Sequence, residues 1–364
     1  MALRFGTDGV RGVANAELTP ELALVLGRAA RVLGGDHVVI GRDPRRSGPM
    51  LEAALAAGFA SAGGDVELVG VVPTPAVAYL SDVQRCVGAV ISASHNPFAD
   101  NGIKLFAPGG RKLPDDVEEA IEAEIERELG GEVGNRPRGP GSAPSGRRRT
   151  PRAYADHLVG LFETPGVLTG LDIALDCANG ATSALAPEVF DRLGARVVVR
   201  AAAPDGCNIN DQCGATHPGP LAHAVEVGGF ELGLAFDGDG DRLIAVDHTG
   251  AVVDGDHIIA ICALDLHRRG LLRPRHRGRH RDDEPGLPPG HGAGRHPRRR
   301  DGRGRPLRPR GARGRRLHDG WRAERPCGLH RPGHDGRRHP HRPRPGRTSS
   351  NGPDGRWRSW PRRR

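Results

Sequence analysis

The sequence predicts an α/β protein in which consecutive α/β domains are followed by a low-complexity tail. Three observations predict it. Helical and strand periodicities alternate in short units through residues 1–266, as expected for helices layered on sheets. Polar, Gly-rich segments follow the ends of several predicted strands. The composition then changes abruptly, and apolar periodicity stops.

The first 130 residues contain the elements of one such domain. Thr19 and Pro20 provide an N-cap and a first helical residue, and the apolar positions after them continue as a helix. A Gly/Pro/Arg-rich linker or exposed loop follows over residues 130–152. The predicted helices cover residues 20–32, 47–62, 75–81 and 117–129, and the predicted strands cover residues 37–40, 66–69 and 86–92.

A second alternating unit starts at Tyr154. Its apolar runs are again short, and one of them ends directly at Asp237. The globular pattern stops with a helix that begins at His257. The predicted strands cover residues 171–176, 196–199, 232–236, 244–247 and 251–253, and the predicted helices cover residues 184–193, 221–227 and 257–266.

The charge of the chain is divided between two different compositions. Residues 1–266 hold 22 basic and 36 acidic residues, a net of −14, whereas residues 267–364 hold 31 basic and 8 acidic residues, a net of +23. The second segment has no Ile, Val, Phe, Tyr, Met or Lys, so it cannot bury enough apolar surface to offset its ordering entropy. The basic pI of about 10.0 therefore belongs to this segment, and whole-chain charge is no argument for nucleic-acid binding.

Membrane and secreted proteins are not expected. No apolar run reaches the roughly 18 residues of a membrane-spanning helix, and the N-terminus lacks the apolar region of a signal peptide. The six cysteines show no CxxC spacing. We expect them to be free thiols in a reducing cytoplasm.

An acidic loop follows the strand that ends at Asp237. Asp237, Asp239 and Asp241 alternate with glycines, and Arg242 follows them. Carboxylates at every second position of a tight loop can converge on one hard cation, and glycine relieves the backbone crowding. An acidic surface turn is the alternative, but the pattern favours a metal site, with Mg²⁺ as the ion because the ligands are all oxygen.

A second polar loop, Ser92 to Pro97, follows another predicted strand. Loops at the strand ends of α/β sheets commonly present catalytic groups. Ser94 beside His95 could be a hydrolase nucleophile, but the glycines of a nucleophile elbow are absent, and a plain turn is the other alternative. Downstream, Lys104 adds a basic group that suits acid–base chemistry or the neutralisation of phosphate charge.

Two further Gly-rich segments are weaker signals. Residues 5–12, which include Arg11, combine small residues, a cation and exposed backbone amides, which suits an anion or phosphate. A turn with a solvated arginine explains the same segment. Residues 41–48 are typical of a helix-entry loop with Ser47 near the cap.

Together these motifs resemble the α-D-phosphohexomutase superfamily, and their combination is most similar to its bacterial phosphoglucosamine mutases. The similarity runs through residues 1 to about 270 and includes residues 208–210, 213–218 and 253–256. The resemblance implies α/β domains with mixed sheets and an isomerase that converts glucosamine 6-phosphate to glucosamine 1-phosphate through a bisphosphate intermediate, in amino-sugar and cell-wall precursor synthesis. A phosphomannomutase or phosphoglucomutase of the same superfamily is the nearest alternative.

The resemblance also assigns the nucleophile and the metal ligands. Ser94 corresponds to the phosphoserine, and its phosphate shares one Mg²⁺ with Asp237, Asp239 and Asp241. Phosphoryl transfer depends on charge neutralisation and in-line positioning, and a metal that bridges the seryl phosphate supplies both.

Four further roles follow from the same resemblance. His95 and Lys104 assist proton transfer at the sugar hydroxyl, Arg11 contacts phosphate near the nucleophile, and Arg242 neutralises nearby charge. The expected partner is a small sugar phosphate, with neither a membrane nor a specific nucleic acid.

The resemblance stops near Arg273. The superfamily's third-domain sugar loop, Gly-Gly-Glu-Gln-Ser-Gly-His, and its fourth-domain phosphate loop do not occur in residues 274–364. When the possible codons of residues 321–329 are started one nucleotide late, they permit Gly-Glu-Gln-Ser-Gly-His-Val-Val-Phe, and residues 334–341 and 276–287 permit other third-domain sequence. We therefore expect a one-nucleotide frame change and little or no mutase activity from the chain as printed; a natural basic tail that binds RNA or DNA is the alternative.

Four segments are expected from these observations. They are residues 1–150, an α/β domain with the phosphoserine loop; residues 151–253, an α/β domain with the metal loop; residues 254–273, the start of a truncated third domain; and residues 274–364, a disordered tail rich in Arg, Gly, Pro and His.

Overall fold

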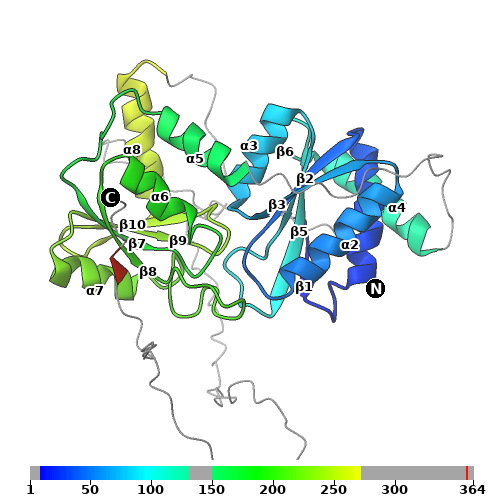
Figure 1. The fold of residues 1–364 in the computed structure, drawn as a ribbon, viewed down its shortest axis with the longest axis horizontal. Helices are drawn as coiled ribbons and strands as arrows, with labels where there is room; N and C mark the ends of the chain where they lie inside the picture. Colours follow the sequence, from blue (N-terminus) through cyan, green and yellow to red (C-terminus); the bar gives the residue numbers. More distant parts are fainter. Residues whose placement is uncertain (1–8, 131–149, 272–357, 360–364) are drawn as a thin grey trace, which may run out of the picture. The chain divides into compact units, whose positions relative to one another are not determined.

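The computed structural model describes residues 9–130, 150–271 and 358–359 (Figure 1). The linker expected before residue 150, the frame change and the nucleic-acid-binding tail fall largely or wholly outside these described residues. In the described part, no helix is long and apolar enough to cross a membrane. The five cysteines that fall within it carry free thiols.

The first sheet is mixed, as expected from the resemblance. Its described strands are β1 (Val10–Val13), β2 (His37–Arg42), β3 (Asp65–Val71), β4 (Val87–Ile91), β5 (Asp100–Ala107) and β6 (Arg111–Lys112). They lie in the order β1-β5-β4-β2-β3, with β6 beside β5. β2 pairs in parallel with β3 and β4, whereas β5 pairs antiparallel with β4, β1 and β6.

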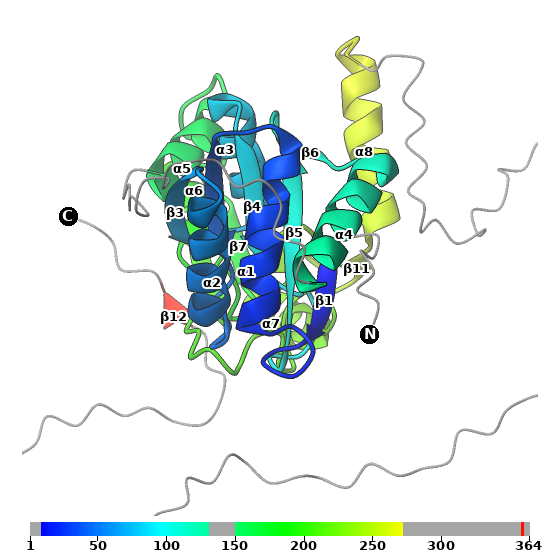
Figure 2. The same ribbon diagram turned by 90° about the vertical axis from the view of Figure 1, so that its right-hand side faces the viewer.

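Helices cover both faces of this sheet (Figures 1 and 2). They are α1 (Pro20–Ala29), the 3₁₀ turn η1 (Ala30–Leu33), α2 (Gly48–Ser61), α3 (Thr74–Gln84) and α4 (Asp115–Leu129). Successive side chains of a strand point to opposite faces, so Val38 and Ile40 of β2 pack with α1, α2 and α4, and Val39 packs with α3. The Thr19 hydroxyl accepts a hydrogen bond from the Leu22 N–H, which confirms the predicted cap.

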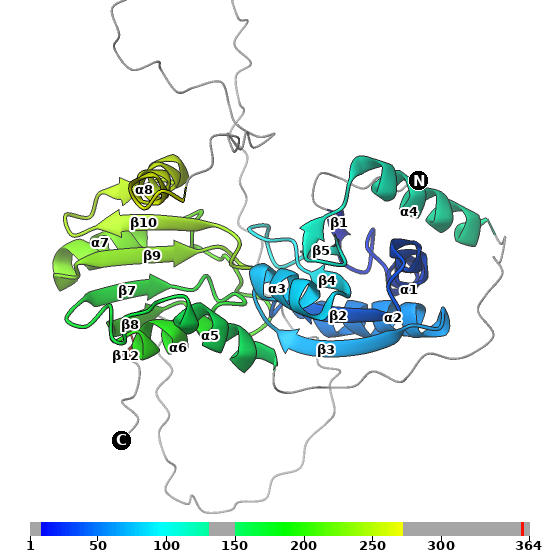
Figure 3. The same ribbon diagram turned by 90° about the horizontal axis from the view of Figure 1, so that it is seen from above.

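The second sheet repeats this plan (Figure 3). Its described strands are β7 (Asp172–Asp176), β8 (Arg196–Arg200), β9 (Leu232–Phe236), β10 (Leu243–Asp247), β11 (Val252–Val253) and β12 (Arg358–Ser359). They lie in the order β11-β10-β9-β7-β8-β12, parallel at β9-β7-β8 and antiparallel elsewhere. The accompanying helices are α5 (Thr150–Gly160), α6 (Leu185–Arg192), α7 (Gly219–Gly228) and α8 (Gly255–Arg268).

The second sheet is also buried on both faces. On β7, Leu175 packs with residues of α6, whereas Ala174 packs with Leu221 and Val225 of α7. The alternation of apolar side chains therefore decides which helix covers which face.

Three local expectations were wrong. Val10–Val13, in the segment that includes Arg11, form the strand β1, which was not predicted, and pair with β5. Lys104 lies in the middle of β5, a strand that was not predicted. Helix α5 begins at Thr150, inside the expected linker, and its Tyr154 packs against the first unit's α3 cluster. In each case tertiary packing outweighs a local sequence rich in Gly, Pro, Asp or Asn.

Candidate functional site

The candidate nucleophile, Ser94, lies in the loop that follows β4. Its side chain is buried, with 1% of the residue exposed. The hydroxyl donates a hydrogen bond to Asp237 Oδ2 at 2.5 Å, and the backbone N–H donates to Ser92 Oγ at 2.9 Å. The backbone φ is +52°, in the left-handed region that serine rarely adopts. The serine loop, residues 92–97, is thus held in a specific conformation that directs Ser94 Oγ at the acidic loop.

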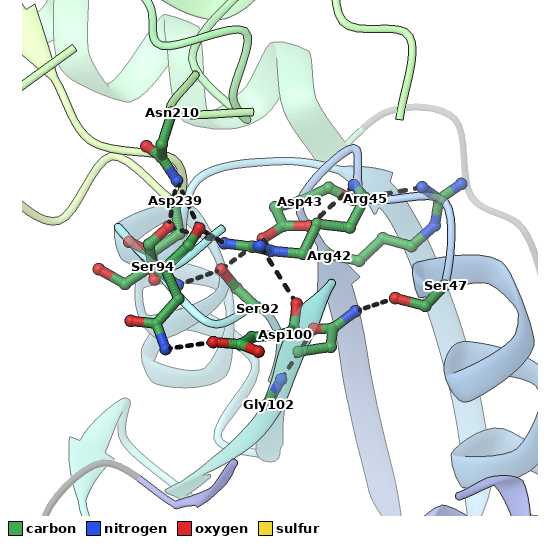
Figure 4. A network of polar contacts seen from close by, with 12 residues as sticks. Arg42, Asp43, Arg45, Ser47, Ser92, Ser94, Asp100, Gly102, Asn210 and Asp239 are labelled. Atoms are coloured by element: carbon green, nitrogen blue, oxygen red, sulfur yellow. Dashed lines mark hydrogen bonds and ion pairs between the residues drawn. The ribbon is translucent and has the colours of Figure 1, made fainter. Parts of the chain in front are cut away.

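A buried ion pair lies beside the serine loop (Figure 4). Arg45 and Asp43 are both fully buried, and the Arg45 Nε lies 2.9 Å from Asp43 Oδ2. The same carboxylate oxygen accepts a hydrogen bond from the Ser92 hydroxyl at 2.6 Å. A buried charge is stable only when it is paired and hydrogen-bonded, and this pair meets both conditions.

The three aspartates come together as expected. Carboxylate oxygens of Asp237, Asp239 and Asp241 lie within 4.8 Å of one another, and we call these residues the acidic cluster. Asp239 is buried, and its Oδ1 has no hydrogen-bond partner among the described residues. A buried carboxylate oxygen without a partner is costly unless a cation occupies its other side. The donor set therefore fits a hard divalent cation.

The aspartates of the cluster differ in their acidity. Burial and the neighbouring charges of Asp239 and Asp241 raise the pKa of Asp237 to about 7. Burial and Asp239 also raise the pKa of Asp241. Burial opposes ionisation of Asp239 too, but the Lys104 ammonium and the Thr74 hydroxyl lower its pKa. Without a cation, repulsion among the carboxylates is thus relieved by protonation.

Two residues of the first unit hold Asp239. The Thr74 hydroxyl, at the start of α3, donates to Asp239 Oδ2 at 2.7 Å, and the Thr74 N–H donates to the Asp239 carbonyl at 2.8 Å. Lys104 Nζ lies 3.4 Å from Asp239 Oδ2 and 3.2 Å from Asp241 Oδ2. These contacts occupy Oδ2, so the remaining free oxygen of Asp239 is Oδ1.

The two predicted arginines, Arg242 and Arg11, both act on His95. The His95 Nδ1 lies 3.4 Å from Ser94 Oγ and 3.1 Å from a terminal nitrogen of Arg242. A guanidinium is a donor only, so Nδ1 is an acceptor in this arrangement. Burial, followed by the charges of Arg242 and Arg11, lowers the pKa of His95. Arg11 lies on β1 opposite Gly102 of β5.

The structure thus brings seven of the predicted site residues into direct contact around the loops after β4 and β9. Arg11 is linked to them through its charge on His95. Sequence reasoning missed the roles of four residues that hold this group. They are Asp43, Arg45, Thr74 and Asn210. Residues 41–48 and 208–210 stand out as motifs in the sequence, but nothing in it reveals which distant loop they contact.

Comparisons with known proteins identify the family. The description of the first matching family model is phosphoglucomutase/phosphomannomutase, alpha/beta/alpha domain I, over residues 2–130, and domain II of the same family matches residues 152–250. The chain belongs to the phosphoglucomutase/phosphomannomutase family. The consecutive α/β domains with mixed sheets are those of this family, which confirms the predicted fold class. The domain limits drawn from the sequence remain predictions.

Members of this family resemble the chain over most of the described residues. A phosphoglucosamine mutase of Symbiobacterium thermophilum is 52% identical over 280 residues, which are 75% of this chain and 62% of the relative. One of Paenarthrobacter aurescens is 52% identical over 285 residues, 75% of this chain and 61% of the relative. The crystal structure of a phosphoglucomutase/phosphomannomutase family protein of Burkholderia thailandensis is 30% identical, with a TM-score of 0.63, and the match covers 73% of this chain and 59% of that one.

The chain therefore spans about three-fifths of the length of the curated relatives that it matches. The matched portion contains the serine loop and the acidic cluster.

Proposed function

We propose that this chain carries the phosphoryl-transfer part of a phosphoglucosamine mutase, which interconverts glucosamine 6-phosphate and glucosamine 1-phosphate. The observation that carries the proposal is the contact between Ser94 Oγ and the acidic cluster, made by two loops that are 143 residues apart in sequence. A hydroxyl held against clustered carboxylates suits a seryl phosphate that shares a cation with them.

Sugar choice rests on the comparisons. The relatives at about half identity are named phosphoglucosamine mutases, whereas the less similar crystal structure carries the broader family name. These identities favour glucosamine phosphate over mannose or glucose phosphate as the substrate.

In the proposed site, Asp237, Asp239 and Asp241 would hold one Mg²⁺ beside the Ser94 phosphate. The ion supplies charge neutralisation for the phosphoryl group when it is bound. Asp239 Oδ1 is the natural ligand atom because Thr74 and Lys104 already occupy Oδ2.

The chain's own residues then serve the two transfers. In the first, the bond between phosphorus and Ser94 Oγ breaks, a bond forms to a hydroxyl of the sugar monophosphate, and the hydroxyl proton passes through a base to the leaving Ser94 Oγ. His95 is a suitable acceptor because its lowered pKa favours the neutral ring. The second transfer returns the phosphoryl group at the other end of the bisphosphate to Ser94 Oγ, whose proton passes back to the sugar oxygen that leaves phosphorus.

Charge around the transferred group comes from three cations. Lys104 contacts the acidic cluster, and Arg242 contacts His95. Arg11 acts on His95 through its charge. In the proposal, Arg11 contacts the phosphate, Arg242 neutralises its charge, and Lys104 assists proton transfer at the sugar hydroxyl.

The test compares two proteins. One is the chain as printed, and the other is encoded by the same gene with the reading frame restored by one nucleotide near the codon for Arg273. The restored-frame chain is expected to convert glucosamine 6-phosphate with Mg²⁺, and to do so at least about tenfold more efficiently than mannose or glucose 6-phosphate. The printed chain is expected to show little turnover, because groups that orient the sugar are needed for efficient transfer. Equal and measurable turnover by the two chains would refute the frame change, whereas no turnover by either chain would refute the proposed function.

A further inference from the structure

Asn210 makes a contact that no step of the proposed function uses. It belongs to the second α/β unit, and its N–H donates to the Ala178 carbonyl of that unit at 2.9 Å. Its side-chain amide instead reaches the first unit's serine loop. Asn210 Nδ2 lies 2.9 Å from the Ser94 carbonyl oxygen and 3.1 Å from the Asn96 carbonyl oxygen. The residue is buried, with 8% exposed.

The same two carbonyls also receive hydrogen bonds from Arg45. Its Nη2 lies 2.9 Å from the Ser94 oxygen and 2.9 Å from the Asn96 oxygen. A carbonyl oxygen has two lone pairs, so each oxygen accepts one donor from each α/β unit. Figure 4 shows the Arg45 guanidinium and the Asn210 amide meeting at this loop.

Two features of the site accompany this double set of donors. Ser94 is kept at a φ of +52°, a conformation that persists in a serine only where its surroundings impose it. Gly238, between two residues of the acidic cluster, packs directly on the same atoms. A Cβ there would lie 2.5 Å from the Ser94 oxygen and 2.8 Å from Asn210 Nδ2, so glycine is required for this close approach.

We propose that Asn210 is a positioning residue which, together with Arg45, fixes the serine loop against the acidic cluster. Its consequence for catalysis rests on the proposed function: loss of the amide would misplace Ser94 Oγ and slow phosphoryl transfer more than it weakens sugar phosphate binding.

The first test measures the loop itself and needs no substrate. Deuterium exchange followed by mass spectrometry is measured on the printed 364-residue chain, for peptides that cover residues 92–101 and β7. Asn210→Ala is expected to accelerate exchange in the loop peptide by about tenfold, the effect of losing two hydrogen bonds. Asn210→Asp, which keeps the shape but replaces the amide donors with acceptors, is expected to accelerate exchange as much.

Asn179→Ala is the matched control. Asn210 has a left-handed φ of +59°, and Asn179 has one of +46°. The Asn179 amide bonds within the second unit, where it donates to the Asn208 carbonyl and Cys213 Sγ and accepts from the Ala203 N–H. This variant is expected to leave loop exchange unchanged. The proposal is overturned if loop exchange is unchanged in Asn210→Ala, if Asn210→Asp behaves as the unsubstituted chain, or if the loop accelerates no more than β7 does.

The second test uses the restored-frame chain. Asn210→Ala is expected to lower kcat by about tenfold or more while KM stays within about twofold. A loop that loosens without any loss of kcat would overturn the positioning role. If the loop loosens but even the unsubstituted restored chain transfers no phosphate, the proposed function fails while the structural role of Asn210 stands.

Discussion

Protonation of Asp237 should compete with the binding of a divalent cation. Burial and two neighbouring carboxylates raise the pKa of Asp237 to about 7 in the metal-free site. Because a ligand carboxylate must be ionised, the apparent dissociation constant should rise as pH falls below this value. For one titrating group, protonation multiplies the apparent dissociation constant by about 11 near pH 6 and by about 1.1 near pH 8. The affinity for Mg²⁺ should therefore differ by about tenfold between these two pH values.

Isothermal titration calorimetry of the 364-residue chain with Mg²⁺ measures this effect directly. Titrations in two buffers of different ionisation enthalpy should show about 0.9 proton released per ion near pH 6 and about 0.1 near pH 8. Asp247→Asn is the control, because this carboxylate lies outside the acidic cluster at the end of β10, and the variant should keep the same pH dependence. An affinity that does not change with pH, with no proton release near pH 6, would refute the electrostatic account of the cluster.

Three further predictions concern single side chains. Asp239→Asn should weaken Mg²⁺ binding by about tenfold or more and lower the activity of the restored-frame chain with it; unchanged affinity in calorimetry would remove Asp239 from the ligand set. Thr74→Val removes the hydroxyl that orients Asp239 and should weaken Mg²⁺ binding by about tenfold, with a far-UV spectrum like that of the unsubstituted chain; if affinity is retained, Thr74 has no role in orienting the ligand. Leu26→Ala, at a fully buried position of α1, should lower the free energy of unfolding in urea by about 2–5 kcal/mol, whereas Leu264→Ala, at a residue of α8 that is 62% exposed, should lower it by at most about 0.5 kcal/mol. Equal losses would show that Leu26 is not buried in the folded chain.

The elements that the sequence predicted well are those with a strong local pattern. The helix after Thr19 has a cap, a proline at its first position and a wide apolar face, and α1 begins where expected. β5 was missed because Asp100, Asn101 and Gly102 are typical of loops. They are extended here because β5 is flanked by β1 and β4, and those pairings are formed across the sheet rather than along the chain.

The same distinction applies to the site. Ser94 and the acidic cluster could be proposed because each lies in a compact motif at a strand end. The residues that support them could not be proposed, because their partners lie far away in sequence. Arg45 bonds to the Ser94 carbonyl from 49 residues away, Asn210 from 116, and Thr74 reaches Asp239 across 165 residues. Side-chain type and spacing do not show which loops the two sheets bring together.

The most direct test of the central claim, that Ser94 carries the transferred phosphate, is a mass measurement on the restored-frame chain. Peptide mapping of the purified protein should place one phosphate on Ser94. Isotopically labelled phosphate on Ser94 should appear in the glucosamine phosphates when the protein is incubated with Mg²⁺ and unlabelled glucosamine 6-phosphate, while Ser94 itself stays phosphorylated. Ser94→Ala should abolish both the mark and the turnover. Phosphate on another residue, or turnover near the unsubstituted rate in Ser94→Ala, would contradict the account.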